Sequence, residues 1–149
     1  MIARIRKSME QKDQGFTLIE LLVVMIIIGI LAAIAIPIFM NQRKKAVDAS
    51  ATSDVSTLGK EVATYYVDAT AVLTAASVSA ASGGDLTVVA SVGNASTNTT
   101  AATLTYPGPA GSGTVGDAAL SWCVDVTYSA GTRSHVFYSA QNGLSITGC

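Results

Sequence analysis

The sequence has few of the residue types from which most catalytic and metal sites are built. It contains one histidine, His135, and two cysteines, Cys123 and Cys149, and only 13% of its 149 residues are charged. No glycine-rich phosphate loop follows a predicted strand, and no activating base neighbours either cysteine in the sequence. We therefore expect a protein that is not an enzyme and that uses no metal ion or other cofactor.

Net charge is also nearly absent. The full chain carries a formal charge of −1, which argues against a bulk electrostatic affinity for nucleic acid. The charges are unevenly divided, because residues 1–15 carry four basic and two acidic groups whereas residues 16–149 carry five basic and eight acidic groups. A basic segment ahead of an apolar one is a signal of membrane topology.

Apolar residues are in excess, and they are concentrated in residues 16–40. Glu20 is the one charge in this stretch, and the 20 residues from Leu21 to Met40 carry none. As a helix these 20 residues span ~30 Å, enough to cross the core of a bilayer. Composition alone leaves three interpretations: a secretory signal peptide, an uncleaved signal anchor, or a leader that is cut off before the apolar segment. The sequence NQRKKA that follows is a poor signal-peptidase site, and its basic residues oppose the charge bias of a simple anchor.

The run GFTLIE at residues 15–20 favours the third interpretation. It closely resembles the prepilin peptidase site of type IV pilins and of the related pseudopilins. The resemblance continues over about a third of the mature chain, to roughly residue 47. It implies that residues 1–15 are a cytoplasmic leader, that the chain is cut between Gly15 and Phe16, that Phe16 is then N-methylated, and that Glu20 is used in assembly.

Glu20 is also unusual on physical grounds. An isolated carboxylate inside a membrane helix costs roughly 2–3 kcal/mol or more, so it normally has a partner. The amino group created at Phe16 is one, because an ion pair near 4 Å in an intermediate dielectric is worth about 4 kcal/mol before desolvation. Glu20 could alternatively complement its own helix N-terminus or its own Phe16 amine. We expect pairing with the Phe16 amine of a neighbouring subunit in a filament, chiefly because of the family resemblance.

Gly29 and Pro37 interrupt the apolar segment. Proline removes one helical hydrogen bond, and glycine weakens a helix by roughly 1 kcal/mol, although both are tolerated in membrane helices. The resemblance to type IV pilins implies that the segment between them loses helicity when a subunit leaves the bilayer.

The helical pattern continues beyond Pro37 to about Val67. Its polar collar, Asn41–Lys45, suits the outer membrane boundary, where long cationic side chains extend toward water. Apolar residues then recur at three- and four-residue spacing, with Asp48, Asp54 and further charged residues mostly on the opposite side. The predicted apolar face consists of Val47, Ala51, Val55, Leu58, Val62, Tyr65 and Tyr66.

The remainder predicts a small antiparallel sheet packed on the amphipathic half of the helix, so that the fold class is α+β. Residues 16–40 are the transmembrane or filament-core segment, and residues 41–149 are the helix continuation and the globular head. Trp122 is expected in the core. The predicted strands, one or two of which come from the middle region, are Leu86–Val92, Thr103–Tyr106, Ala119–Tyr128, Ser134–Ala140 and Leu144–Thr147.

The two cysteines are well separated and not in a metal-binding pattern. In an exported domain such a pair indicates one disulfide, whereas in the cytosol it indicates two inert thiols. The membrane segment favours export, so we expect a bridge between Cys123 and Cys149. In the chain-entropy model it would stabilise the head by roughly 3–4 kcal/mol.

The leading functional hypothesis is a pilin subunit that polymerises into a type IV pilus. The resemblance implies a single-pass precursor in the bacterial cytoplasmic membrane and then a filament at the cell surface. It also implies four kinds of partner, namely other copies of the chain, a prepilin peptidase and N-methyltransferase, an assembly platform, and membrane lipid before assembly. Two alternatives stay open: a minor pilin or pseudopilin of a type II secretion or competence apparatus, and a monomeric membrane-tethered binding module.

Overall fold

The computed structural model describes residues 15–107 and 113–149, and the chain forms two compact parts that divide between Met40 and Asn41. Helix α2 (Leu18–Tyr65) contributes residues to both parts. The N-terminal part is described from Gly15 to Met40. The second part, residues 41–149, is called the head here. Most of the predicted leader lies outside the described residues.

The head is built on the second half of α2. One face of this half is buried, and it holds the apolar residues that the helical spacing predicts. Tyr65 and Tyr66 are half-buried against the core at the end of the helix, also as predicted. The helix ends two residues earlier than the predicted boundary. Its buried apolar and glycine positions are Val47, Ala51, Val55, Leu58, Gly59 and Val62.

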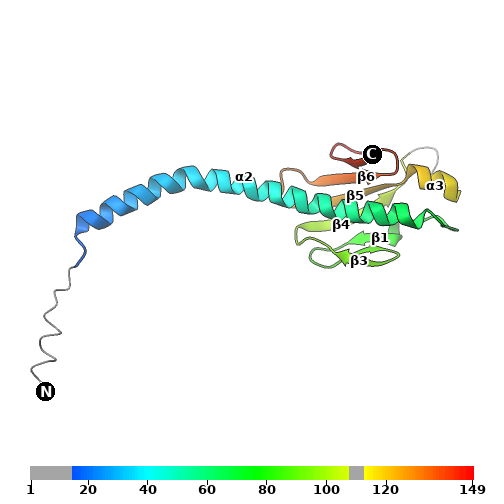
Figure 1. Cartoon of the computed structure of the whole chain (residues 1–149), viewed down its shortest axis with the longest axis horizontal. Coiled ribbons are helices and arrows are strands. Elements are labelled where there is room, and N and C mark those ends of the chain that lie inside the picture. The colour runs from blue at the N-terminus through cyan, green and yellow to red at the C-terminus, as the bar shows by residue number, and fades with distance from the viewer. Residues whose placement is uncertain (1–14, 108–112) are drawn as a thin grey trace, which may run out of the picture. The chain divides into compact units, whose positions relative to one another are not determined.

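Two antiparallel sheets pack on α2, as Figure 1 shows. A short 3-10 helix, η1 (Ala75–Ser77), leads into the first sheet, and α3 (Val115–Ser121) precedes the central strand of the second. The strand order is β1-β2-β3 in one sheet and β4-β5-β6-β7 in the other. The strands are β1 (Val78–Ala80), β2 (Asp85–Val88), β3 (Ala90–Asn94), β4 (Thr99–Thr105), β5 (Cys123–Tyr128), β6 (His135–Ser139) and β7 (Gly143–Ser145).

The core lies between α2 and the inner faces of the sheets. In β5 the inward side chains alternate, and Val124, Val126 and Tyr128 are all almost completely buried. Trp122, just before β5, is also buried, as the sequence predicts, and its ring stacks on Tyr138 of β6 at a centroid distance of 6.1 Å. The predicted α+β class, a long helix packed on antiparallel sheet, is confirmed.

The predicted strand Leu86–Val92 is wrong, because the chain reverses within it. Residues on either side of Val89 pair with one another, so the run forms β2 and β3. Val89 makes this reversal in the left-handed region, with φ 65°, and its N–H donates to the Ser77 carbonyl at 2.8 Å. A β-branched residue is rarely found in this conformation, which glycine or asparagine normally adopts. A valine at this position therefore gives no signal of a turn in the local sequence. The middle region therefore forms a sheet of its own and contributes only β4 to the meander.

The first part of the predicted strand Ala119–Tyr128 is also wrong. The segment up to Ser121 belongs to α3, whose N-terminus is capped by Thr114: the Thr114 Oγ1 accepts a hydrogen bond from the Asp117 N–H at 3.2 Å. Leu120 fits the alternating pattern of the strand that follows, but it is exposed on this helix. The strand begins only at Cys123.

Asp48 is predicted on the solvent side of α2, and this prediction is wrong, because only 6% of the residue is exposed. Its carboxylate accepts hydrogen bonds from the Tyr128 hydroxyl at 2.9 Å, from the N–H and hydroxyl of Thr132, and from the Arg133 N–H at 3.4 Å. Burial raises the pKa of Asp48, but the hydrogen bonds from Thr132, Tyr128 and Arg133 outweigh it and hold the pKa below its usual range. The β5–β6 turn is thus fixed to α2 by one carboxylate.

Asp54 is a second correction of the same kind, since it is only 5% exposed. Its carboxylate accepts hydrogen bonds from the N–H and hydroxyl of Ser96, at 2.9 and 3.0 Å, and from the Thr99 hydroxyl at 2.6 Å. These donors lie in the connection from β3 to β4 and at the start of β4. A buried carboxylate is tolerated when its oxygens are satisfied in this way, and Asp54 therefore joins this connection to α2.

Gly59 of α2 is expected to tolerate no side chain. A Cβ added there would lie 2.9 Å from the Cβ of Tyr138 and still closer to its ring, which is held by the stack on Trp122. We expect Gly59→Ala to lower the free energy of unfolding by about 1–3 kcal/mol through overpacking, despite its better helix propensity. Thermal unfolding of the full chain in detergent measures this. Gly116→Ala is the matched control: no atom of residues 15–107 or 113–149 lies within 4 Å of its added Cβ, so equal losses in both variants would contradict the prediction.

Candidate functional site: the processing and assembly segment

The predicted cleavage site lies in non-helical backbone just before α2. Gly15, Phe16 and Thr17 are all exposed, and 87% of Phe16 is accessible. No heavy atom of the described residues lies within 4 Å of the position that a Gly15 Cβ would take. A peptidase needs an accessible bond outside regular secondary structure, and both residues of the Gly15–Phe16 bond are exposed and non-helical. Cleavage and methylation themselves remain predictions.

Glu20 is hydrogen-bonded within its own helix turn. Its Oε2 accepts the Thr17 N–H at 2.9 Å and the Thr17 hydroxyl at 2.8 Å, and the Glu20 N–H donates to the Thr17 Oγ1 at 3.3 Å. This reciprocal pattern is a capping box, which satisfies amide donors that a helix N-terminus leaves free. Of the alternatives open from the sequence, the structure displays the one in which Glu20 complements its own helix. Pairing with a neighbour's amine remains a prediction for the assembled state.

Thr17 is the functional residue that the sequence interpretation missed. The spacing Thr17-x-x-Glu20 just before an apolar run is the sequence signature of a capping box, so the signal was present. Thr17 gives the carboxylate two donors while the subunit is alone, and this lowers the cost of placing Glu20 beside an apolar segment.

The first half of α2 is apolar on every side. Between Leu18 and Met40 nearly all side chains are exposed, including large residues such as Ile28 and Phe39. A helix that is apolar all round needs lipid or other protein as its surroundings. Among the described residues, α2 is the one helix that is long and apolar enough to cross a membrane. Anchoring in a membrane and burial in a filament would each remove the apolar surface of this helix from water.

Gly29 and Pro37 lie within the unbroken helix. The helix continues through both, and an added Cβ at Gly29 would meet no atom of the described residues within 4 Å. The ring of Pro37 removes one backbone hydrogen bond from this stretch. The loss of helicity between these residues on assembly stays a prediction, since the single chain is helical there.

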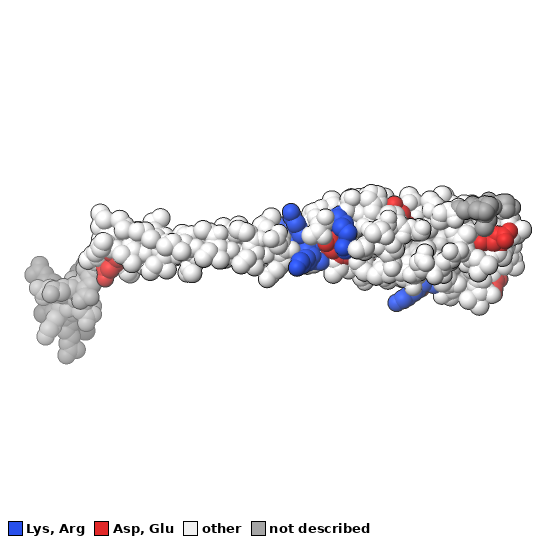
Figure 2. Space-filling model, turned by 90° about the horizontal axis from the view of Figure 1, so that it is seen from above, with Lys and Arg blue, Asp and Glu red and all other residues white. Residues whose placement is uncertain are grey.

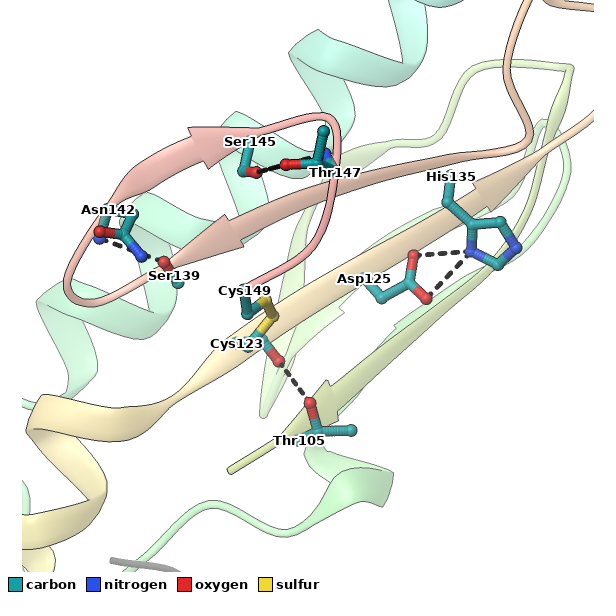
Figure 3. Close-up of a disulfide and its surroundings, with 9 residues drawn as sticks. All are labelled: Thr105, Cys123, Asp125, His135, Ser139, Asn142, Ser145, Thr147 and Cys149. Atoms are coloured by element: carbon teal, nitrogen blue, oxygen red, sulfur yellow. Dashed lines mark hydrogen bonds and ion pairs between the residues drawn. A yellow bond between two sulfur atoms is a disulfide. The ribbon is translucent and has the colours of Figure 1, made fainter. Parts of the chain in front are cut away.

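The two cysteines are joined by a disulfide on the outer face of the second sheet (Figure 3). Their Cα atoms are 6.1 Å apart, and Cys123 occupies the first position of β5. The bridge encloses β6 and β7, so the C-terminal segment is attached to the central strand. Sequence reasoning expected this pairing from the number of cysteines and from export.

Removing the disulfide is expected to destabilise the head by about 3–4 kcal/mol, because the unfolded chain gains the freedom of the 26-residue separation. Denaturant unfolding of the exported protein with and without a reductant measures the change. A double variant, Cys123→Ala with Cys149→Ala, should match the reduced protein and respond to reductant no further. An oxidised protein whose unfolding midpoint is unaffected by reductant would contradict the prediction.

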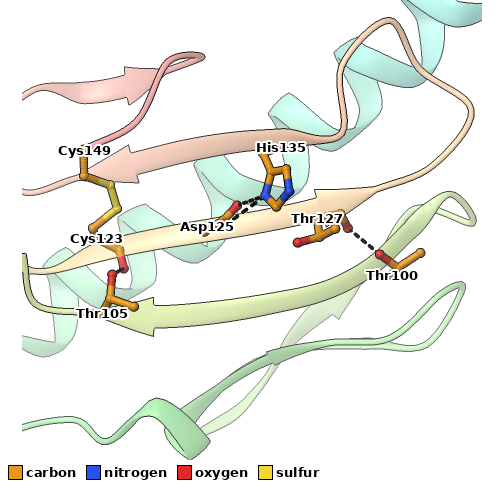
Figure 4. Close-up of polar contacts among 7 residues, drawn as sticks. All are labelled: Thr100, Thr105, Cys123, Asp125, Thr127, His135 and Cys149. Carbon is orange, nitrogen blue, oxygen red and sulfur yellow. Dashed lines mark hydrogen bonds and ion pairs between the residues drawn. A yellow bond between two sulfur atoms is a disulfide. The ribbon is translucent and has the colours of Figure 1, made fainter.

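The outer face of the same sheet carries the one ion pair found among the described residues. The Asp125 carboxylate lies 3.0 Å from the Nδ1 atom of His135 on the adjacent strand (Figure 4). Hydroxyl groups of Thr100 and Thr105 donate to carbonyls of β5 near this pair. No group of three or more histidine, cysteine or acidic side chains within residues 15–107 and 113–149 could hold a metal ion.

The N-terminal residues of the chain are similar to those of known proteins. Residues 11–36 match the family described as the prokaryotic N-terminal methylation motif. The chain is 38% identical over 60 residues to type II secretion system core protein G of Dickeya chrysanthemi, which covers 40% of this chain and 39% of the relative. The corresponding protein of Escherichia coli (strain K12) is 40% identical over 57 residues, covering 38% of this chain and 39% of the relative.

A fimbrial protein is also similar. Fimbrial protein EcpB of Eikenella corrodens is 60% identical over 35 residues, which is 24% of this chain and 22% of that protein. The chain therefore matches about two-fifths or less of the length of these relatives, and no solved structure matches it significantly. The resemblance predicted from the run GFTLIE is confirmed: the N-terminal region matches the methylation motif and is similar to that of type IV pilin-like proteins, a group that includes the pseudopilins.

Proposed function

We propose that this protein is a structural subunit of a pseudopilin type, which polymerises through the first half of α2. The observation that carries the proposal is the all-round apolar surface of that half, most of which lies within the match to the methylation motif at residues 11–36. A helix of this kind can leave lipid only if other apolar surface replaces it. Identical helices of neighbouring subunits supply such a surface, and the role is structural rather than catalytic.

Maturation creates the Phe16 amine, with which Glu20 can form an ion pair. A prepilin peptidase cuts between Gly15 and Phe16 in the precursor, which is held in the cytoplasmic membrane, and the new Phe16 amine is methylated. Before assembly Glu20 is satisfied by Thr17. During assembly on its platform, the subunit brings Glu20 next to the Phe16 amine of a neighbour, so that two charges are buried as a pair.

The names of the relatives support the hypothesis of a pseudopilin over that of a pilus subunit. Seven similar proteins from different bacteria are each called type II secretion system core protein G. We therefore place the pseudopilin of a secretion apparatus ahead of the pilus subunit as the proposed function. A type IV pilus subunit is the second candidate, favoured by the 60% identity to a fimbrial protein over 35 residues.

A deletion strain separates the two candidates. A strain that lacks this chain is expected to lose export of secreted proteins while its surface filaments, seen by electron microscopy of sheared material, are unchanged. Loss of surface fibres with normal secretion would support the pilus subunit instead. A strain unchanged in both respects would contradict both candidates and favour a tethered binding module.

Processing is tested at Gly15. Replacement by leucine is expected to slow cleavage about 100-fold, because a peptidase pocket that accepts only a hydrogen atom rejects a bulky side chain. Mass spectrometry of the membrane fraction should show the wild type beginning at methylated Phe16 and the variant beginning at Met1. Gly29→Ala, another glycine of the apolar region with open space around it, should be cut normally. A wild-type chain that still begins at Met1 would overturn the proposal.

A further inference from the structure

The basic residues of the head gather at one end. Of its five lysines and arginines, Arg43, Lys44 and Lys45 lie on the first turns of α2 within the head. Arg133 is beside them, since its N–H donates to Asp48 on the next turn of α2. All four side chains are exposed. Figure 2 shows a cluster of blue side chains at one end of the head, and Arg43, Lys44, Lys45 and Arg133 are together called the basic end.

Carboxylates gather at the other end of the head. Asp68 follows three residues after the end of α2 at Tyr65, and Asp117 lies in α3. The α3 region packs at the same end, because Ala119 and Trp122 line a shallow hollow together with Tyr66. Both aspartates are exposed, and red side chains mark this end in Figure 2. This group is called the acidic end.

The two ends are not neutralised within one chain. Lys45 and Tyr65 are separated by 20 residues of helix, or ~30 Å, which no side chain can bridge. Within residues 15–107 and 113–149, His135–Asp125 is the one ion pair. Asp48 does not neutralise the basic end fully, because it is a single charge and its oxygens are occupied by buried hydrogen bonds.

We propose that the basic end of one head contacts the acidic end of the next copy in the filament. This inference rests on the proposed function and names the contact between heads that accompanies helix packing. If two heads were stacked end to end by a twofold axis, like ends would face each other, with four cations against four cations, which is repulsive. A head-to-tail arrangement brings opposite charges together and does not close on itself, so it continues as a filament.

Apolar groups at the acidic end support a contact surface there. Val67 is 85% exposed and Leu120 is 69% exposed, the first beside Asp68 and the second on α3 with Asp117. Covering these two side chains with another protein surface would remove apolar area from water, which favours a contact at this end. The methylene stems of lysine and arginine cover apolar surface while their charged ends reach carboxylates. The basic end therefore complements both parts of the acidic end.

Zero-length cross-linking of isolated filaments tests the contact directly. A carbodiimide joins an amine to a carboxylate that touches it, and mass spectrometry then identifies the joined peptides. We expect Lys44 or Lys45 joined to Asp68 or Asp117. The ~30 Å of helix between the two ends excludes the same link within one chain. Intact filaments without this link would overturn the inference and leave the proposed function standing, whereas absence of any filament would count against the proposed function.

Charge exchange in the full chain gives the second test. Lys44→Glu and Asp68→Lys should each lower filament yield about tenfold, because like charges then meet, and the double variant should recover most of it. Lys60→Glu is the control, an exposed change of equal charge on α2 outside the basic end. No recovery in the double variant would overturn the inference. A second outcome would also overturn the inference: the Lys44→Glu precursor binds anionic lipid vesicles less well, but its filament assembly is unchanged. That result would assign the basic end to lipid headgroups.

Discussion

Replacing Glu20 by alanine is expected to lower filament yield about 100-fold or more and to leave membrane insertion unchanged. In the assembled state the variant buries the Phe16 amine without a counter-charge, and an uncompensated buried charge costs about 3–5 kcal/mol. Each 1.4 kcal/mol corresponds to a factor of ten in an equilibrium constant. The precursor itself loses only the capping box with Thr17, and alanine is easily accommodated in lipid.

Glu20→Gln separates the two roles of this side chain. Glutamine keeps a carbonyl oxygen that accepts the Thr17 donors, but it carries no charge. If charge pairing drives assembly, Glu20→Gln stays as defective as Glu20→Ala. Sheared filaments are quantified by immunoblot against total processed subunit, so that cleavage and assembly are measured apart. Normal filament yield from Glu20→Ala would remove the assembly role and favour a membrane-tethered module.

Replacing Asp48 by alanine is expected to have the second largest effect, a loss of about 3–5 kcal/mol in the free energy of unfolding of the head. The change removes the acceptor for the Tyr128 hydroxyl and for backbone N–H groups of Thr132 and Arg133. Buried donors left without an acceptor cost about 1–3 kcal/mol each when water cannot reach them. Denaturant unfolding of the full chain in detergent measures the loss. Asp68→Ala, at an exposed aspartate, should change stability by no more than about 0.5 kcal/mol.

The response to acid follows from the same carboxylate. The pKa of Asp48 is lower in the folded head than in the unfolded chain, so the folded state binds fewer protons. Its contribution to stability is therefore fully present above the ordinary aspartate pKa of about 3.9 and is lost as the pH falls through the folded value. We expect the unfolding midpoint to fall below about pH 4, and to fall less steeply in Asp48→Asn. Equal acid sensitivity in the two proteins would contradict this assignment.

The helix and its apolar face could be predicted because they depend on local periodicity. Val55, Leu58 and Val62 recur at helical spacing, and their burial needs no knowledge of the partner strands. The processing segment was also recognisable, since six adjacent residues carry the resemblance. Its contact between Thr17 and Glu20 is local as well, so the three-residue spacing contained the signal although the prediction did not use it.

Asp48 and Asp54 could not be assigned in this way. Their donors are 42 to 85 residues away in the sequence, so polarity alone placed them on the solvent side. The reversal at Val89 was missed for a related reason: its left-handed conformation depends on tertiary contacts, including the N–H bond to Ser77. These two buried carboxylates and this chain reversal depend on hydrogen bonds between residues distant in the sequence, which periodicity does not reveal.

The disulfide has a mechanical consequence for any fibre that carries tension. Pulling on a free C-terminus would peel β7 and then β6 from the sheet one hydrogen bond at a time, a route with low resistance. Cys149 is anchored to Cys123 at the start of β5, so a load applied to the chain end enters the sheet at its central strands. Those strands must then slip past one another together, with several hydrogen bonds loaded at once. The bridge thereby replaces sequential peeling of the C-terminal strands by simultaneous shearing of the inner strands.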